Sequence, residues 1–275
     1  MWKCDKILKY IINFNVYFSK KSKKMNKELV NKQNKKIDRI AKISGFIVFF
    51  IALLTYTLTM EPTNSWWDCG EYIATAYKLQ VGHPPGAPLF LLIANLFSQL
   101  AGGDVEKVAL MINFMSALFS AGTIFLLFWT TKRIADKLVS ENAKETGLSI
   151  LAAIIGSLAY AFSDSFWFSA VEGEVYAMSS FFTALVFWAI IKWEAETNTN
   201  PKANRWLIFI AFLIGLSIGV HMLSLLVIPA IVLIYYFKKF SFSFNGFIIA
   251  NIFAVLLLGF IYNIIIPQFV NLAGK

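Results

Sequence analysis

Two carboxylates and a histidine lie close together just after the first long apolar run of the chain: Asp68, Glu71 and His83. Asp68 and Glu71 are three residues apart, so both face the same side if this segment is helical. Carboxylate and imidazole groups accept and pass protons in general acid–base catalysis. Because ionisable groups near hydrocarbon are costly, such a cluster at the end of a membrane helix indicates a functional site.

Each of these residues also has an ordinary structural explanation. Asp68 and Glu71 stand where a helix would begin, and carboxylates there cap the helix and favour its dipole. Trp66 and Trp67 are typical of anchors at the membrane interface, although they also offer a face on which a sugar could stack. His83 precedes two prolines and could serve only to stabilise a turn. Taken together, the five residues favour a functional site.

A second group of candidate residues lies further along the chain. Glu172 and Glu174 flank a glycine between two apolar segments, and Tyr176 follows them. The alternative for the acids is an ordinary solvated loop, but their aromatic neighbours hold them close to the membrane surface. His221 stands at another apolar junction, where the alternative is a buried structural histidine. The sequence predicts a functional role for at least one of the two acids.

No motif of a known cofactor site is present. The chain has no Gly-rich phosphate loop, no His-Glu-x-x-His pair, no Cys-x-x-Cys pair and no Gly-x-Ser-x-Gly turn. The acids and the two histidines are suitable ligands for a divalent cation, but their spacing is not diagnostic. We therefore expect no cofactor and assign no metal site, and a divalent cation remains the open alternative.

The composition is that of an integral membrane protein. Hydrophobic residues make up 58% of the chain, and the mean hydropathy is +0.63, which is too apolar for a soluble domain of this length. The excess positive charge is confined to the start: residues 1–42 hold 13 Lys and Arg against 3 Asp and Glu, and residues 43–275 hold 12 against 13. A basic segment before a membrane helix indicates a cytoplasmic anchor on anionic lipid, not nucleic-acid binding.

Seven apolar segments are expected to cross the bilayer, whose core of about 30 Å needs about 20 helical residues. They are residues 44–60, 108–130, 148–168, 176–193, 206–219, 222–237 and 246–266. The apolar run 86–101 is short of a full span. If that run lies on the surface, the basic loops of the later chain fall on the side of the basic tail, as the positive-inside rule requires.

The sequence thus predicts an all-α, polytopic transmembrane helix bundle with its N-terminus in the cytoplasm. Its expected parts are a basic cytoplasmic tail (1–43), a transmembrane module (44–266) and an external end (267–275). The first external loop, 61–107, would carry two surface helices, at about 69–80 and 86–101, separated by a proline-rich turn. All the candidate site residues then lie on the external side. Cys4 and Cys69 fall on opposite sides, so we expect no disulfide between them.

Three blocks of the sequence resemble a known family. They are Trp67–Phe90 with the motif Trp-Asp-Cys-Gly-Glu-Tyr, Ser163–Met178 with Val-Glu-Gly-Glu-Val-Tyr, and Gly215–His221. These blocks resemble a bacterial membrane family found mainly in Bacteroidetes. That family is similar to the vertebrate transmembrane O-mannosyltransferases of glycosyltransferase family 117 and looks like part of the GT-C superfamily. The resemblance covers about residues 44–240.

The resemblance implies a GT-C-like fold and an activity. Enzymes of this superfamily take a sugar from a polyprenyl-phosphate carrier on the external side of the membrane, with an acidic residue of the first external loop as the base. It implies Asp68 as that base, with Glu71 beside it in the catalytic group. The residues that it implies for substrate binding are Trp67, His83, Glu172, Glu174, Tyr176 and His221.

The expected function is transfer of a mannose-like sugar from polyprenyl phosphate to Ser or Thr of extracytoplasmic proteins. The expected location is the bacterial inner membrane, with the active site on the periplasmic face. GT-C enzymes usually hold the carrier phosphate with a basic side chain, whereas the external side here offers only Lys78, Lys107 and His221 near the site. Family members are much longer, so we expect this chain to be a fragment, which could be inactive alone.

Two functions of other classes stay open at this point. The first is a transporter or flippase, in which the acids form a cation or proton path. Transporters place ionisable groups near mid-span, whereas the acids here lie at span ends. The second is a non-catalytic assembly subunit, which the short length of the chain allows.

Overall fold

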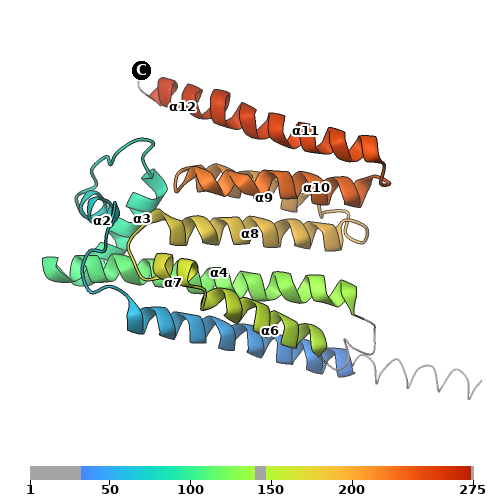
Figure 1. Ribbon diagram of the computed structural model, residues 1–275, viewed down its shortest axis with the longest axis horizontal. Helices are drawn as coiled ribbons and strands as arrows, with labels where there is room; N and C mark the ends of the chain where they lie inside the picture. Colours follow the sequence, from blue (N-terminus) through green and yellow to red (C-terminus); the bar gives the residue numbers. More distant parts are fainter. Residues whose placement is uncertain (1–31, 140–146, 274–275) are drawn as a thin grey trace, which may run out of the picture.

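The computed structural model describes residues 32–139 and 147–273, which form helices joined by short loops and contain no strand. The long helices lie side by side, roughly along one direction (Figure 1). The prediction of an all-α helix bundle is therefore confirmed. Most of the expected basic tail, including Cys4, lies outside the described residues.

The helices follow the apolar segments of the sequence. In chain order they are a first helix, Lys32–Thr59, then α2 Cys69–Lys78, α3 Pro88–Ser98, α4 Val108–Leu138, α6 Leu148–Ala161, α7 Asp164–Ala170, α8 Val175–Glu196, α9 Arg205–Ile218, α10 Ile228–Lys239, α11 Phe244–Phe260 and α12 Ile266–Ala273. Short segments of tighter or wider helix extend them at η1 Gln99–Ala101, η2 Val105–Lys107, η3 Met222–Val227 and η4 Ile261–Ile265. Apolar side chains and few charges make these segments stable as helices inside a bilayer.

Within the described residues, five helices are long and apolar enough to cross a membrane, or six if the bent pair α6 and α7 is one span. The expected fifth span is α9, whose 14 residues reach about 21 Å at 1.5 Å per residue. That length is below the bilayer core, although α9 runs beside α8 within the bundle (Figure 1). The number of seven spans therefore stays a prediction.

One expected span is not a single straight helix. Residues 148–168 were expected to cross as one segment, but α6 and α7 meet at an angle of 70°. Ser163 between them has an extended backbone, and its hydroxyl donates a hydrogen bond to the Tyr160 carbonyl at 2.8 Å. The polar Ser163 and Asp164 begin a new helix instead of continuing the old one. As a result, α7 lies at one end of the bundle.

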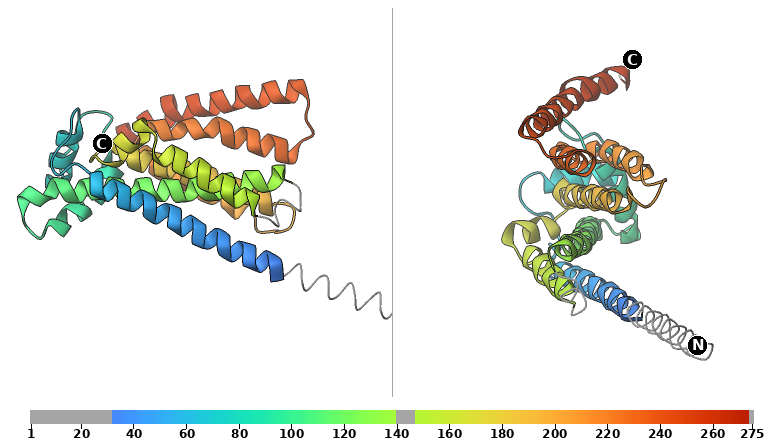
Figure 2. Two further views of the ribbon diagram at one scale, coloured as in Figure 1. Left: turned by 60° about the horizontal axis from the view of Figure 1, so that its bottom comes forward. Right: turned by 90° about the vertical axis from the view of Figure 1, so that its right-hand side faces the viewer.

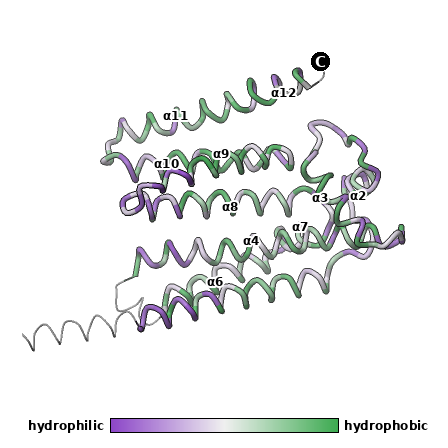
Figure 3. The backbone as a smooth tube through the Cα atoms, turned by 180° about the vertical axis from the view of Figure 1, so that it is seen from behind, coloured by the Kyte–Doolittle hydropathy of each residue, from purple (hydrophilic) through white to green (hydrophobic). Residues whose placement is uncertain are grey.

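The two ends of the bundle differ in composition. At the tail end, where the first helix begins, α4 ends and α6 begins, and the chain reverses between α8 and α9 and between α10 and α11 (Figure 2). Hydrophilic residues gather at this end (Figure 3), where Glu194 on α8 binds Lys137 of α4 and Lys238 of α10. The opposite end, which we call the site end, carries α2, α3, α7 and the turn before η3.

The core consists of two clusters that meet at α4. One joins the first helix to α4, α6 and α7 through small residues such as Ala52 and Ala121. The other joins α4 to α2, α3, α8 and α9, with Phe90 and Trp193 fully buried. Small residues at helix contacts let backbones approach closely, which is how helices pack in membranes. The long helix α4 therefore supports both the bundle and the helices of the site end.

The two short helices expected between the first two long ones are present and pack on each other. Asn95 of α3 donates hydrogen bonds to the backbone carbonyls of Ala76 and Tyr77 at the end of α2. The first backbone N–H groups of α3, from Leu89 and Phe90, donate to the Gly219 carbonyl at the end of α9. These bonds satisfy groups that a helix terminus leaves unpaired, so α2 and α3 are fixed to the site end of the bundle.

Candidate active site

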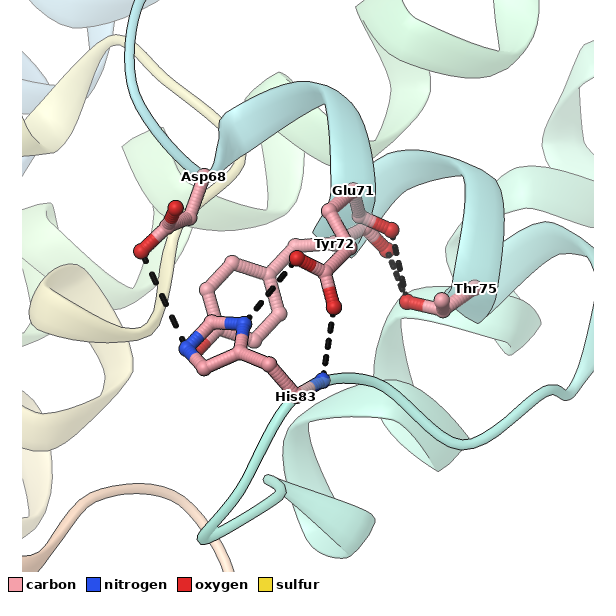
Figure 4. Close-up of polar contacts among 5 residues, drawn as sticks. All are labelled: Asp68, Glu71, Tyr72, Thr75 and His83. Carbon is pink, nitrogen blue, oxygen red and sulfur yellow. Dashed lines mark hydrogen bonds and ion pairs between the residues drawn. The ribbon is translucent and has the colours of Figure 1, made fainter.

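Asp68, Glu71 and His83 come together at the site end, with the imidazole between the two carboxylates (Figure 4). The His83 Nδ1 atom lies 3.0 Å from Oε2 of Glu71. The other ring nitrogen, Nε2, lies 3.8 Å from Oδ2 of Asp68. The backbone N–H of His83 donates to Oε1 of Glu71 at 2.6 Å. Glu71 therefore holds the histidine at two points and turns its ring toward Asp68.

Helix capping does not account for the Asp68 carboxylate. Asp68 occupies the N-cap position of α2, but its side chain makes no hydrogen bond to the first turn. The carboxylate of Glu71, in that first turn, is bound to His83 instead. The Asp68 side chain is 56% exposed, so an incoming substrate can reach it. The preceding Trp67 has a positive φ of 61°, which marks a tight change of direction just before α2.

Hydrogen bonding sets the charges of this trio. The backbone N–H and the ring of His83 lower the pKa of Glu71 below its usual value. In turn, the hydrogen bond to Glu71 and its negative charge raise the pKa of His83. Glu71 is therefore the anionic partner, and His83 gains protonated character near neutral pH. A protonated ring directs an N–H at Nε2 toward Asp68.

Tyr72 belongs to this site although sequence reasoning did not select it. Its ring centroid lies 5.8 Å from that of His83 and 5.3 Å from that of Phe90. Burial and the surrounding carboxylates raise the pKa of Tyr72 to about 12, so its hydroxyl keeps its proton. The only sequence signal for Tyr72 is its position directly after Glu71. Aromatic residues are so common in this chain that this position alone does not distinguish it.

Glu172 and Glu174 lie in a buried loop between α7 and α8, not in a solvated one. They are 1% and 6% exposed. Within the described residues, neither carboxylate oxygen of Glu172 has a hydrogen-bond partner. Burial raises the pKa of Glu172. Burial, and then the negative charges of Glu172 and Asp68, raise the pKa of Glu174 to about 7. Asp68 therefore lies near enough to Glu174 for its negative charge to help raise the pKa of Glu174.

A close fit holds this acidic loop against α4. A Cβ atom on Gly173 would lie 2.9 Å from Oδ1 of Asn113 and 2.9 Å from Cγ2 of Ile112. Asn113 also donates hydrogen bonds from Nδ2 to the carbonyls of Glu61 and Thr63, at 2.7 and 2.9 Å. One buried amide on α4 thus joins the segment that leads to Asp68 and the loop that carries Glu172 and Glu174.

Tyr176 and His221 form a separate pair at the same end. Their ring centroids are 5.4 Å apart in an edge-to-face arrangement. Nδ1 of His221 accepts a hydrogen bond from the Leu223 backbone N–H at 3.2 Å, and burial lowers the pKa of His221. The ring is therefore neutral, and its proton sits on Nε2.

A groove of about 490 Å³ runs from this pair into the bundle. Tyr176 and Leu223 line it at the site end, and Thr131 and Ile134 of α4 line it further toward the tail end. Its wall is mainly apolar, with hydroxyl groups from both α4 and α8. The groove is open along part of the membrane-spanning region, so a long apolar chain could lie in it with a polar group at the site end.

The other candidates have less definite positions. Trp66 and Trp67 are 82% and 87% exposed, which fits the anchor interpretation as well as a sugar-stacking face. Lys107 pairs with Asp104 at 2.8 Å, and Lys78 lies over its neighbour Tyr77. The cationic group placed beside Asp68 is therefore His83.

The trio also bears on metal binding. One ligand atom from each of Asp68, Glu71 and His83 lies within 4.8 Å of the others, so these residues could offer three ligands to a divalent cation. The His83 ring already forms a hydrogen bond with Glu71 and lies at ion-pair distance from Asp68. Binding a cation would replace these contacts, and a cation here stays an alternative.

Comparisons with known proteins point to one family. Residues 68–243 match the family described as Protein O-mannosyl-transferase TMEM260 N-terminal domain. That region contains every candidate site residue except Trp66 and Trp67. A protein of Dictyostelium discoideum named Protein O-mannosyl-transferase tmem260 is 28% identical over 204 residues, which cover 70% of this chain and 23% of that protein.

A Mus musculus protein named Protein O-mannosyl-transferase TMEM260 is 29% identical over 181 residues, which cover 66% of this chain and 24% of that protein. The chain thus spans about a quarter of the length of these curated relatives. No solved structure matches it.

Proposed function

The chain belongs to the TMEM260 N-terminal domain family, and from this membership we propose that it is the membrane-embedded catalytic part of a protein O-mannosyltransferase. The donor in this proposal is a mannose-like sugar on a polyprenyl phosphate, and the acceptor is a Ser or Thr hydroxyl of an extracytoplasmic protein. The observation that carries the proposal is the exposed Asp68 carboxylate, backed by the His83–Glu71 pair at the end of a membrane helix bundle.

In the proposed reaction, Asp68 is the general base. Its carboxylate takes the proton of the acceptor hydroxyl while the hydroxyl oxygen attacks the anomeric carbon of the sugar. The bond between that carbon and the phosphate oxygen breaks, and the carrier phosphate leaves with the bonding electrons. A single displacement of this kind inverts the anomeric centre.

Glu71 and His83 have a positioning role in this reaction. Glu71 fixes Nδ1 of the imidazole, so Nε2 faces the Asp68 carboxylate. A protonated His83 would direct its Nε2 proton toward the Asp68 carboxylate and so orient that side chain before the reaction. A protonated His83 would also offer a positive charge to the carrier phosphate if that phosphate lay next to Asp68. This role matters because few lysine or arginine side chains lie around the site.

The lipid-linked donor is supported by the groove between α4 and α8. Its apolar wall suits a polyprenyl chain, and its site end at Tyr176 adjoins His221 and the acidic loop. In this arrangement Glu172, Glu174, Tyr176 and His221 would line the sugar pocket. A carboxyl group that keeps its proton, as Glu174 does up to about pH 7, can donate a hydrogen bond to a sugar hydroxyl.

A transporter is a weaker candidate. The ionisable side chains of the described spans lie close to the helix ends, as with Lys132 and Glu194 near the tail end. A proton or cation path needs such groups near the middle of the membrane.

The proposal also fixes an orientation, with the site end in the periplasm of a bacterial inner membrane. Cysteine labelling in intact cells tests it, with Cys4 changed to Ser and the buried Cys69 left in place. We expect an impermeant thiol reagent to label Val81→Cys, because Val81 is 92% exposed at the site end. Lys202→Cys at the tail end should react only after the cells are opened. The reverse pattern would place Asp68 in the cytosol and end the proposal.

The activity itself is tested by mass spectrometry of exported proteins. Cells that lack the gene should lose hexose-modified Ser and Thr peptides that the parent cells contain, and the restored gene should bring them back. Unchanged glycopeptides in the deletion strain would contradict the proposal. A general loss of exported proteins, modified or not, would instead favour an assembly subunit.

A further inference from the structure

A polar pocket lies at the tail end of the bundle, far from the candidate active site. It has a volume of about 380 Å³ and is formed by the first helix, α4 and α8. Nothing in the proposed transferase mechanism uses it. Because the tail end carries the basic loops, the pocket lies where the membrane helices leave the bilayer on the cytoplasmic side of the proposed orientation.

Charges of both signs line this tail-end pocket in equal number. The cations are Lys132, Arg133 and Lys192, and the carboxylates are Asp38, Asp136 and Glu196. Lys132 and Asp136 neutralise each other within α4 at 2.8 Å. Arg133 and Lys192 remain as exposed cations at the rim, together with the exposed carboxylate of Asp38.

Glu196 is the fixed carboxylate of the pocket. It accepts hydrogen bonds from Asn200 Nδ2 at 3.1 Å and from Trp206 Nε1 at 3.2 Å. Among the described residues, both of these donors reach Oε2, so the second oxygen is left for a further donor. Neutral donors hold the carboxylate in place without cancelling its charge.

Two tryptophans complete the pocket. Trp129 and Trp188 are half-buried in its wall, and the Lys192 ammonium lies 5.6 Å from the Trp188 ring centroid. Tryptophan is typical of the headgroup level of a membrane. Basic pockets between membrane helices at this level bind phospholipid headgroups.

We propose that the tail-end pocket binds the headgroup of a phospholipid that carries both a phosphate diester and a primary ammonium, as phosphatidylethanolamine does. The planar guanidinium of Arg133 and the ammonium of Lys192 suit the phosphate. Asp38 and Glu196 suit the ammonium of the lipid, which donates hydrogen bonds that a quaternary ammonium cannot. A headgroup that carries only negative charge would have no positive group to pair with the carboxylates of Asp38 and Glu196.

Native mass spectrometry of the full chain, released from nanodiscs, tests this proposal. The nanodiscs hold equal amounts of phosphatidylethanolamine, phosphatidylglycerol and phosphatidylcholine with the same acyl chains. We expect phosphatidylethanolamine to be retained over both others. Arg133→Gln and Lys192→Gln should each lower its retention about threefold, and the double variant about tenfold, the scale of partly exposed ion pairs.

Lys202→Gln is the matched control, because Lys202 is exposed at the same end and does not line the pocket. It should retain the lipid as the unchanged chain does. Preference for phosphatidylglycerol, no preference among the three lipids, or full retention by the double variant would each overturn the proposal. Displacement of the lipid by an equal concentration of soluble phosphoethanolamine would assign the pocket to a soluble ligand and overturn it as well.

Discussion

Replacing Asp68 by Asn should abolish sugar transfer while the protein still inserts in the membrane at its normal level. Asparagine has the same size and shape but cannot take a proton from the acceptor hydroxyl. Loss of a general base costs about 10²–10⁴-fold in rate. Asp68 is exposed and caps no helix turn through its side chain, so its replacement should have little effect on folding.

The measurement is transfer of labelled mannose from a polyprenyl-phosphate donor to an acceptor peptide, in membranes that contain the full-length protein. Asp104→Asn is the matched control. Asp104 lies in the same connecting segment, and its carboxylate contacts Lys107 at 2.8 Å and the Glu106 backbone N–H at 3.1 Å, not Asp68, Glu71 or His83. The control should keep its activity, because an exposed ion pair contributes little to stability. If Asp68→Asn transfers mannose as fast as the control, Asp68 is not the base.

Replacing Gly173 by Ala should destabilise the protein and lower transfer at the same time. The new methyl group would lie 2.9 Å from atoms of Asn113 and Ile112 and 3.2 Å from Ile73. Contacts under 3.0 Å force the loop or α4 to move. Overpacking a closely fitted core costs about 1–3 kcal/mol, and any movement of this loop displaces Glu172 and Glu174.

Gly215→Ala provides the comparison for this substitution. Gly215 lies within α9, and a Cβ atom there meets nothing within 4 Å. Alanine favours a helix over glycine by about 1 kcal/mol, so this variant should unfold at the same temperature as the unchanged protein or slightly above it. The unfolding midpoint in detergent and the transfer rate are measured for both variants. Equal midpoints and rates for the two would show that the fit around Gly173 does not hold the site.

The class of the protein and most helix positions could be predicted from the sequence. Apolar runs separated by basic loops indicate membrane helices because hydropathy acts within each segment and needs no partner. The short helices α2 and α3 could also be predicted, because the two prolines after His83 prevent one continuous helix. The bend at Ser163 was missed, because its polar neighbours could equally have formed a solvated helix end.

The acids at 68, 71, 172 and 174 could be selected singly, from their cost beside hydrocarbon. The approach of the pair Asp68 and Glu71 to the pair Glu172 and Glu174 could not be predicted, because residues about 100 positions apart meet only through packing. Asn113 and Gly173 decide that meeting, and neither carries a chemical signal of its own. The burial that raises the pKa of Glu174 also belongs to the tertiary structure, since the loop packs against α2 and α4.

The sequence by itself determined that this chain lies in a membrane and carries chemistry-bearing side chains at one set of helix ends. Only the tertiary structure decided that His83 stands between Asp68 and Glu71 and that the second acidic loop is buried beside them. The physical reason is that the two properties depend on different residues. The preference of a helix for lipid is a sum over residues that are neighbours in the sequence. The charge of a carboxyl group depends on the groups that pack against it, which can lie far away in the sequence.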